Sequence, residues 1–387
     1  MIQTPEKLDQ LCQELSKEPM IALDTEFIRE RTYYPNIALI QVASSKKSFL
    51  IDPLAFSPKQ LKPLLKILQN KKILKILHAA QADQECFLVS YNCLASPIFD
   101  TAEAAALCGF GESPGLASLV THVLGVNLRK GSARAHWKQR PLPPELIKYA
   151  LADVDHLIPL TQKLMEKLKG KKRLDWAMEL SQQWADPDRF YPNPQKIAKD
   201  MVGNGRVDPR GYLALQELAT WREELAQKRN IPRRRIADNA TLISLANVRP
   251  TSIEHLESFR GLNAKDIKDH GESLVKKLKK IESLDPNKLP KLPKQKPLSS
   301  HQKRVADFLR LALEDLSHQL RIAPQRLLPA EKLSAIVRGS FKTPEDLVET
   351  KILSSQIFEL IGPFIWALLQ SKKGLTLDKG RLKLVDL

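Results

Sequence analysis

The chain has 387 residues, 43% of them hydrophobic, which is enough apolar material for about two or three domains with separate cores. Its formal charge of +17 favours a polyanionic partner, and nucleic acid fits better than a membrane because no run of about 18 apolar residues is present. The four cysteines form no C-x-x-C pair and the N-terminus has no signal-peptide pattern, which argues against a disulfide framework or zinc site and favours a reducing, cytoplasmic setting.

The stretch from Ile21 to Phe27 predicts a short strand, which follows an amphipathic helix expected within residues 1–20. Side chains alternate along a strand, so Asp24 and Glu26 share one face of an otherwise apolar segment. Two neighbouring carboxylates repel each other, and a pair of Mg²⁺ or Mn²⁺ ions would remove this repulsion and serve phosphodiester cleavage. By pattern alone, a surface strand with a solvated polar face explains the pair at least as well.

Further strands and a helix are predicted after this strand. Residues 37–42 and 47–51 predict two strands, residues 59–68 predict a helix, and residues 72–77 predict a strand that ends at His78. This alternation of strand and helix predicts an α/β layer in which helices cover a sheet.

Asp83 follows the predicted strand 72–77 and lies near the start of the next helix. Positions between the end of a strand and a helix often carry catalytic groups in open α/β sheets. A favourable interaction with the helix dipole explains the same residue equally well. Further along, Asp100 and Thr101 cap an Ala-rich helix, and we interpret them as structural.

The segment 144–168 predicts an amphipathic helix that Pro159 kinks or restarts. Glu145, Tyr149 and Asp153 are spaced by four and therefore lie on one helical face. In one site, the carboxylate of Asp153 would bind a metal and the phenol of Tyr149 would hold a water. A plain amphipathic helix with its polar side in water is the simpler interpretation.

The rest of the chain predicts helical modules separated by linkers. Residues 186–209 have a linker composition, and residues 284–299 interleave Pro with Lys, which predicts an extended cationic linker. Residues 210–284 and 300–372 have helical periodicity, and the first of these contains a basic run between 228 and 235. The predicted domains are an α/β domain with linker at 1–200, a helical domain at 208–285 and a second helical domain at 298–380.

Three motifs, in this order, resemble the DEDD superfamily of 3′→5′ exonucleases and, within it, the ribonuclease D family. They are Asp24-Thr25-Glu26-Phe27, His78-Ala79-Ala80-Gln81-Ala82-Asp83 and Tyr149-Ala150-Leu151-Ala152-Asp153, with further likeness at Arg29 to Pro35, Trp137 and Arg140-Pro141-Leu142. The Tyr-x-x-x-Asp form of the third motif is typical of the tyrosine subgroup, and the resemblance covers roughly residues 1–170. His136 is a departure, because the family usually has Asp before this Trp.

The tail resembles the HRDC module, a helical nucleic-acid-binding domain shared with RecQ-type helicases. The likeness lies at Trp221-Arg222-Glu223, Ala226, Asn230-Ile231-Pro232, Ile236, Asp238, Leu242 and Leu245-Ala246. Residues 300–375 are similar to a weaker second copy. The implied architecture is an α/β ribonuclease H-like domain, with a mixed sheet covered by helices, followed by two all-α HRDC-type domains.

The resemblance also implies roles for the motif residues. Asp24 is expected to bridge two divalent cations, Mg²⁺ or Mn²⁺, with Glu26 and Asp153 completing one site, Asp83 acting on the second, and Tyr149 orienting the nucleophilic water. The implied function is a cytoplasmic, monomeric 3′→5′ exoribonuclease that trims RNA 3′ ends, including those of tRNA precursors, and releases nucleoside 5′-monophosphates. The alternatives are a DNA exonuclease of the same superfamily and a non-catalytic RNA-binding scaffold, and the complete carboxylate set argues against the scaffold.

Overall fold

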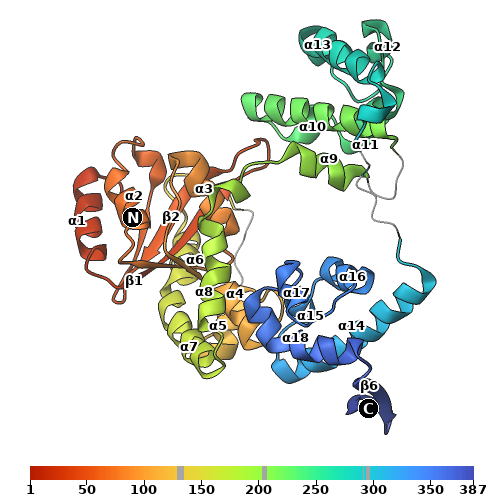
Figure 1. Cartoon of the computed structure of the whole chain (residues 1–387). Coiled ribbons are helices and arrows are strands. Elements are labelled where there is room, and N and C mark those ends of the chain that lie inside the picture. Colours follow the sequence, from red (N-terminus) through yellow and green to blue (C-terminus); the bar gives the residue numbers. More distant parts are fainter. Residues whose placement is uncertain (129–134, 203–206, 291, 293–296) are drawn as a thin grey trace.

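The computed structural model describes residues 1–128, 135–202, 207–290, 292 and 297–387 of the chain. An α/β domain carries two helical bodies, which we name the first helical region (residues 194–284) and the second helical region (residues 300–386). In Figure 1 the first helical region lies beside the α/β domain at the top of the view and the second lies beside it at the bottom.

The strands of the α/β domain, as far as the structure describes the chain, build a mixed five-stranded sheet in the order β3-β2-β1-β4-β5. They are β1 (Met20–Ile28), β2 (Asn36–Ala43), β3 (Ser48–Ile51), β4 (Leu74–Leu77) and β5 (Ile98–Asp100). β1 is antiparallel to β2 and parallel to β4, and β4 is parallel to β5. The predicted strands are confirmed, whereas β5, with three residues, is too short to give an alternation pattern.

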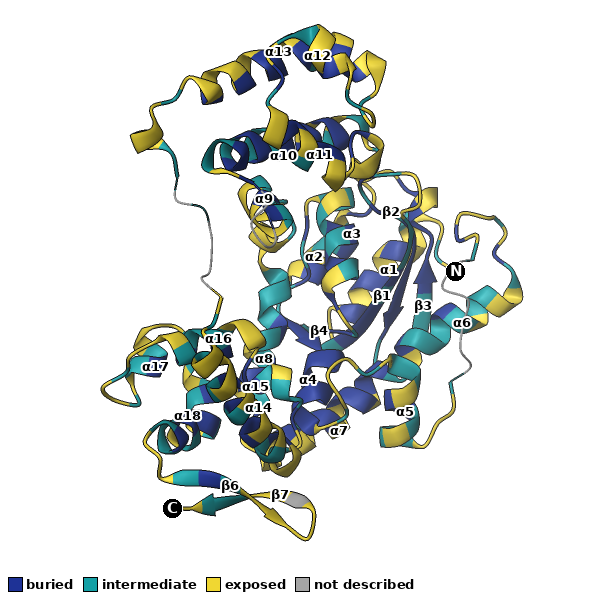
Figure 2. Ribbon diagram, turned by 90° about the vertical axis from the view of Figure 1, so that its right-hand side faces the viewer, coloured by how far each residue is buried: buried dark blue, intermediate teal, exposed yellow. Residues whose placement is uncertain are grey.

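Helices cover both faces of the sheet, and the buried strands between them are dark blue in Figure 2. Apolar side chains of β1 such as Ile21 and Leu23 pack on one face against α1 (Pro5–Leu15), α2 (Lys62–Gln69) and α3 (Gln81–Tyr91). The other face is covered by α4 (Thr101–Cys108), α5 (Leu116–Leu124), α6 (Pro144–Asp155), α7 (Leu157–Gly170) and α8 (Leu174–Gln182). The predicted mixed sheet covered by helices is confirmed. The predicted break near Pro159 is also confirmed, since α6 and α7 meet at His156.

The first helical region contains a helix where a linker was predicted. Its helices are α9 (Pro194–Val202), α10 (Pro209–Arg229), α11 (Asn239–Val248), α12 (Ile253–Glu257) and α13 (Ala264–Glu282). Ala198 and Val202 of α9 are buried in the core of this region. The linker prediction for residues 186–209 is therefore wrong over α9, because Pro194 is the first residue of a helix, where proline is favoured, and not a helix breaker.

The second helical region is not wholly helical. After α14 (Ser300–Leu320), α15 (Pro324–Leu327), α16 (Ala330–Arg338), α17 (Asp346–Glu349) and α18 (Ser355–Leu369), the chain forms an antiparallel hairpin of β6 (Lys373–Asp378) and β7 (Arg381–Asp386). The all-α prediction for this region is wrong there. Lys379 and Gly380 at the turn both have positive φ values, of 49° and 77°, which is the backbone that two-residue hairpin turns require.

The predicted cationic linker lies only partly within the described residues. Pro286 to Lys288 form a short helical turn, and residues 291 and 293–296 lie outside the described part of the chain. Among the helices that the structure describes, none combines the length and the hydropathy needed to cross a membrane.

Candidate active site

Asp24 and Glu26 lie on β1 just beyond its pairing with β4. β4 pairs with β1 from Met20 to Ala22, and its end leads into the turn before α3. At the level of Thr25 the neighbour is therefore a helix, and the Thr25 hydroxyl donates a hydrogen bond of 2.6 Å to Oδ1 of Asp83. The end of one strand thus brings the first two sequence motifs together.

The turn before α3 is shaped by Asp100 at the end of β5. The carboxylate oxygens of Asp100 accept hydrogen bonds of 2.9 Å from the backbone N–H groups of Ala79 and Ala80, and one of 2.8 Å from that of Ala102. Ala79 has a φ of 56°, in the left-handed region that residues with a Cβ rarely adopt, so these bonds hold an unfavourable turn. Asp100 caps α4, as predicted, and also positions the helix that carries Asp83.

Tyr149 and Asp153 lie one turn apart on α6, which confirms the predicted shared face. One oxygen each of Asp24, Glu26 and Asp153 can be chosen so that the three atoms lie within 4.8 Å of one another. Burial raises the pKa of the Tyr149 phenol and the nearby charge of Asp153 raises it further, and the Tyr149 ring packs against Trp137 with 6.0 Å between centroids. Three elements, β1, α3 and α6, therefore bring the five predicted site residues to one place.

The carboxylates of this group share an unfavourable electrostatic environment. Burial raises the pKa of Asp24 well above its usual range, and the negative charges of Asp83, Asp153 and Glu26 raise it further. Burial, with the charges of Asp153 and Asp83, raises the pKa of Glu26 to about 8. Burial likewise raises the pKa of Asp83 to about 7 and that of Asp153 to about 6. Groups this crowded either bind protons or need positive charge beside them.

The donor set fits a hard divalent cation. Carboxylate oxygens are the ligands that Mg²⁺ and Mn²⁺ prefer, and the group of Asp24, Glu26 and Asp153 is compact enough to share one ion. Asp83 lies outside that group of three, but its charge acts on Asp24 and Glu26. The buried Oε1 of Gln41 accepts no hydrogen bond within the described residues, while its Nε2 donates to Asp24 at 3.3 Å. An unsatisfied acceptor beside the acidic group suits a bound water.

Gln41, Arg140 and Asp52 support the site but were not predicted to do so. Arg140 binds both carboxylate oxygens of Asp52, at 2.7 and 2.6 Å, and donates to the backbone oxygens of Ala38 and Trp137. Burial alone would raise the pKa of Asp52, but hydrogen bonds from Arg140 and Gln3 outweigh it and lower that pKa. The pair therefore fixes the segment whose Trp137 ring packs on Tyr149. The conjunction of Trp137 with Arg140-Pro141-Leu142 is the sequence signal that could have indicated this role.

The HRDC-like signature residues of α10 are structural. Trp221, Arg222 and Glu223 are all buried. Arg222 donates to Oδ1 of Asn239 at 2.8 Å, and Glu223 accepts a 2.8 Å hydrogen bond from the hydroxyl of Tyr33, which belongs to the loop after β1. These residues build the helical core and its contact with the α/β domain, so the signature identifies the fold and not an RNA surface.

Known proteins match this chain along most of its length. Residues 1–169 match the family described as 3′-5′ exonuclease, and residues 214–288 match the HRDC domain. Ribonuclease D of Zymomonas mobilis is 34% identical over 376 residues, which cover 96% of this chain and 94% of the relative. Ribonuclease D of Sphingobium indicum is 33% identical over 388 residues, which cover 99% of this chain and 98% of the relative.

The fold matches a solved structure as well. The crystal structure of Escherichia coli RNase D, an exoribonuclease involved in structured RNA processing, superposes with a TM-score of 0.80 at 31% identity, covering 96% of this chain and 98% of that one. A protein from Bifidobacterium adolescentis, at 21% identity and a TM-score of 0.69, shares the fold. From the sequence identity over nearly the whole chain, together with this fold, the chain belongs to the ribonuclease D family of 3′→5′ exoribonucleases.

Proposed function

We propose that this protein shortens RNA from the 3′ end and releases nucleoside 5′-monophosphates, with tRNA precursors and other structured RNAs as substrates. The observation that carries the proposal is the convergence of Asp24, Glu26 and Asp153 within 4.8 Å, beside Asp83 and Tyr149. The Escherichia coli relative, described as acting in structured RNA processing, supports the choice of substrate.

In this proposal Asp24, Glu26, Asp83 and Asp153 hold two divalent cations, Mg²⁺ or Mn²⁺. Asp24 would hold both, because it is the carboxylate on which, besides burial, the charges of Asp83, Asp153 and Glu26 all act. When bound, the two cations make a water more acidic and stabilise the departing 3′-oxygen. The half-buried carboxylates of Asp24, Glu26 and Asp153, with the buried carboxylate of Asp83, would fix the positions of that charge.

Tyr149 has a separate role in the proposal. Burial raises the pKa of Tyr149 above its ordinary value, and the charges of Asp153 and Glu26 raise it further, so the phenol keeps its proton at neutral pH. A protonated phenol cannot act as the base, but it orients a water by hydrogen bonding. Its packing on Trp137 supports a fixed orientation.

The helical regions and the formal charge of +17 are assigned to substrate capture. We propose three domains: an exonuclease domain with linker at residues 1–200, an HRDC domain at 208–285 and an HRDC-like domain at 298–380. At the end of the first of these ranges, α9 packs in the core of the first helical region. The protein is proposed to act as a cytoplasmic monomer. The four free cysteines, all buried as thiols, suit a reducing compartment.

The test compares single-stranded RNA and DNA of one sequence, each 5′-labelled, with Mg²⁺ and with EDTA. We expect a ladder of products shortened from the 3′ end of RNA, with Mg²⁺ and not with EDTA, and mononucleotide 5′-phosphates by chromatography. Faster cleavage of DNA would favour the DNA exonuclease, because a 2′-hydroxyl contact is what separates the two substrates. Binding of RNA without cleavage under any metal would favour the scaffold.

A further inference from the structure

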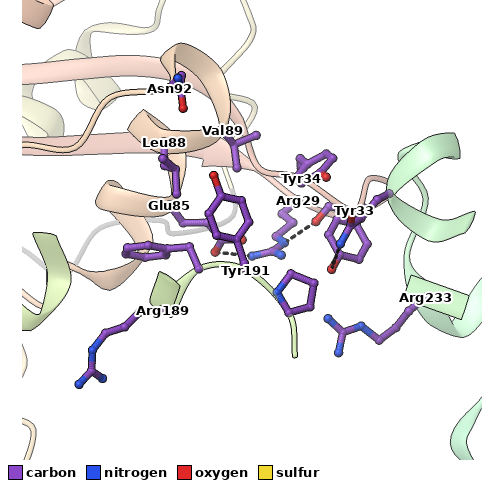
Figure 3. Close-up of a pocket in the computed structure, with 13 residues that line it drawn as sticks. Arg29, Tyr33, Tyr34, Glu85, Leu88, Val89, Asn92, Arg189, Tyr191 and Arg233 are labelled. Carbon is purple, nitrogen blue, oxygen red and sulfur yellow. Dashed lines mark hydrogen bonds and ion pairs between the residues drawn. The ribbon is translucent and has the colours of Figure 1, made fainter. Parts of the chain in front are cut away.

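A cavity of about 570 Å³ lies where the α/β domain meets the first helical region. Its walls come from the loop after β1, from the outer face of α3, from residues 189–192 and from the first helical region. We call it the junction pocket. Figure 3 shows Tyr191 in the middle of this space, with Arg29 and Glu85 behind it and Arg233 pointing towards it from the first helical region.

The lining of the junction pocket is aromatic and cationic. Tyr34, Phe190 and Tyr191 line it together with Arg29, Arg189 and Arg233. Tyr191 is 60% exposed, an unusual exposure for a large aromatic side chain at a concave site. The two phenols of Tyr34 and Tyr191 lie close enough for the second to raise the pKa of the first, after burial. Exposed rings next to arginines are the surfaces on which unpaired nucleic-acid bases stack.

The arginines of the junction pocket are mostly neutralised. Arg29 pairs with Glu85 at 2.7 Å, and Arg233 pairs with Glu223 at 3.1 Å. Arg189 forms no ion pair within the described part of the chain and lies over the Trp184 ring, 5.5 Å from its centroid. Arginines that are already paired with carboxylates bind a phosphate weakly. The aromatic rings of the pocket still offer apolar faces. The charge pattern therefore favours a base over a phosphate as the occupant.

The position of the pocket relates it to the proposed site. Arg29 follows Glu26 by three residues along the end of β1, a distance of about 10 Å for extended chain. Glu85 follows Asp83 by two residues on α3. The elements that carry two of the proposed metal ligands thus also carry the pocket wall. Side chains three apart on a strand and two apart on a helix face different ways, so an RNA strand has to pass over the end of β1 and the first turn of α3 to reach both places.

We propose that the junction pocket binds one unstacked base of the single-stranded RNA substrate, upstream of the 3′-terminal nucleotide, by stacking on Tyr191. The proposal rests on the proposed function for its ligand class. The volume lies within the range of about 300–1,000 Å³ typical of small-ligand sites, which accommodates a single nucleoside. Since every base has an apolar face, the pocket selects unpaired RNA and not a sequence.

The test measures RNA binding in the whole chain with Asp24→Asn present, so that the RNA stays intact. Fluorescence anisotropy is measured for a 5′-labelled single-stranded RNA with the parent chain, with Tyr191→Ala and with Tyr191→Phe. Stacking of one base contributes about 1–3 kcal/mol by alanine substitution. We therefore expect Tyr191→Ala to weaken binding by about 5- to 150-fold, and Tyr191→Phe, the matched control that keeps the ring, to bind within about twofold of the parent.

A second arm locates the base. Single abasic residues are placed at successive positions from the 3′ end of the same RNA. One position is expected to lose affinity in the parent chain and in Tyr191→Phe but not in Tyr191→Ala, because the two changes remove the same contact. Equal affinity of Tyr191→Ala and the parent, or an equal loss in both at every abasic position, would overturn the proposal. A loss that disappears at high salt would also overturn it, since stacking releases no counterion. Failure of the function itself appears elsewhere, as absent RNA cleavage by the unaltered chain.

Discussion

The two helical regions are attached to the α/β domain by different mixtures of polar and apolar contacts. The first is joined through polar contacts to the loop after β1: the Tyr33 hydroxyl donates to Glu223 at 2.8 Å, and the Tyr34 amide donates to Asn230 at 3.0 Å. The second shares one continuous apolar core with α4 and α7. Burial of a large apolar surface contributes a large stabilising free energy, whereas each single polar contact contributes little. We therefore expect the attachment of the first region to be the weaker of the two.

This difference also limits what a truncated form of the chain can test. Tyr33 is only 7% exposed because the first helical region covers it. A chain ending near Lys199 would cut α9, uncover Tyr33 and expose the apolar face of α4 and α7. Removal of the tail would therefore alter the catalytic domain as well as substrate capture, and point substitutions are the sharper test.

The largest expected effect lies in neither helical region. Asp24→Asn removes the charge that all three other carboxylates surround. A loss in kcat of at least about a hundredfold is expected, because each 1.4 kcal/mol of transition-state stabilisation is tenfold and bound metal supplies several. RNA binding and the melting temperature should change little. Retention of more than about a hundredth of the activity would argue against the bridging role of Asp24.

Gly109→Ala tests the attachment of the second helical region. A Cβ at Gly109 would lie 2.7 Å from the backbone oxygen of Arg321, which is too close for any real contact. Overpacking of this kind costs about 1–3 kcal/mol, and hydrogen exchange in α14 and α15 should accelerate while that in α10 stays unchanged.

Gly111→Ala is the matched control for this variant. Gly111 has a φ of +100°, close to the +96° of Gly109, but its added Cβ would meet nothing within 4 Å. Both variants therefore place alanine at a similar positive φ, and the difference between them reports mainly the contact with Arg321. If the two variants destabilise the chain equally, that contact does not hold the second helical region.

Tyr33→Phe tests the attachment of the first helical region. The ring stays in place, but the hydrogen bond to Glu223 is lost, and the expected cost is about 1 kcal/mol because Glu223 keeps its pairing with Arg233. Hydrogen exchange in α10 should accelerate and that in α14 should not. Equal acceleration in both helices would mean that the two attachments are not independent.

The smallest expected effect concerns the ion pair between Glu103 and Arg326, whose atoms lie 2.6 Å apart where the second helical region meets α4. Burial raises the pKa of Glu103 despite the charge of Arg326. The folded chain therefore holds this proton more tightly than the unfolded chain. The free energy of unfolding should fall as pH rises from the ordinary glutamate value through the raised one, and level off above it. Chemical denaturation of Glu103→Gln across that window should give a flatter profile than the unaltered chain, and identical profiles would contradict the shift.

The sequence predicted the grouping of the acidic side chains better than the structure around them. Alternation on β1 and the spacing of four on α6 placed Asp24, Glu26, Tyr149 and Asp153 on the correct faces because these are local, periodic features. The convergence of β1, α3 and α6 required the family resemblance, since pattern alone left each residue with a plain structural explanation. The role of Asp100 in holding Ala79 was beyond local reasoning because it joins strands distant in the chain.

The misjudged segments share a physical cause. Pro194 and the residues around it have the composition of a linker, yet burial of Ala198 and Val202 stabilises α9 as a helix. The hairpin of β6 and β7 depends on a turn at Lys379 and Gly380. The segment just before it, α18, has helical periodicity, and this pattern predicts a helical region that continues past the turn. In both places tertiary packing or turn chemistry outweighs the average composition of the segment.

The stretch from Asp186 to Asn193 has one more consequence, as the connection that enters the first helical region from the α/β domain. Fully extended, eight residues reach about 27 Å. A first helical region that releases Tyr33 stays within that radius, so its return is a unimolecular event at an effective concentration on the order of millimolar. Dilution therefore cannot separate the first helical region from the α/β domain. An RNA that enters between them competes with a tethered region whose local concentration is constant.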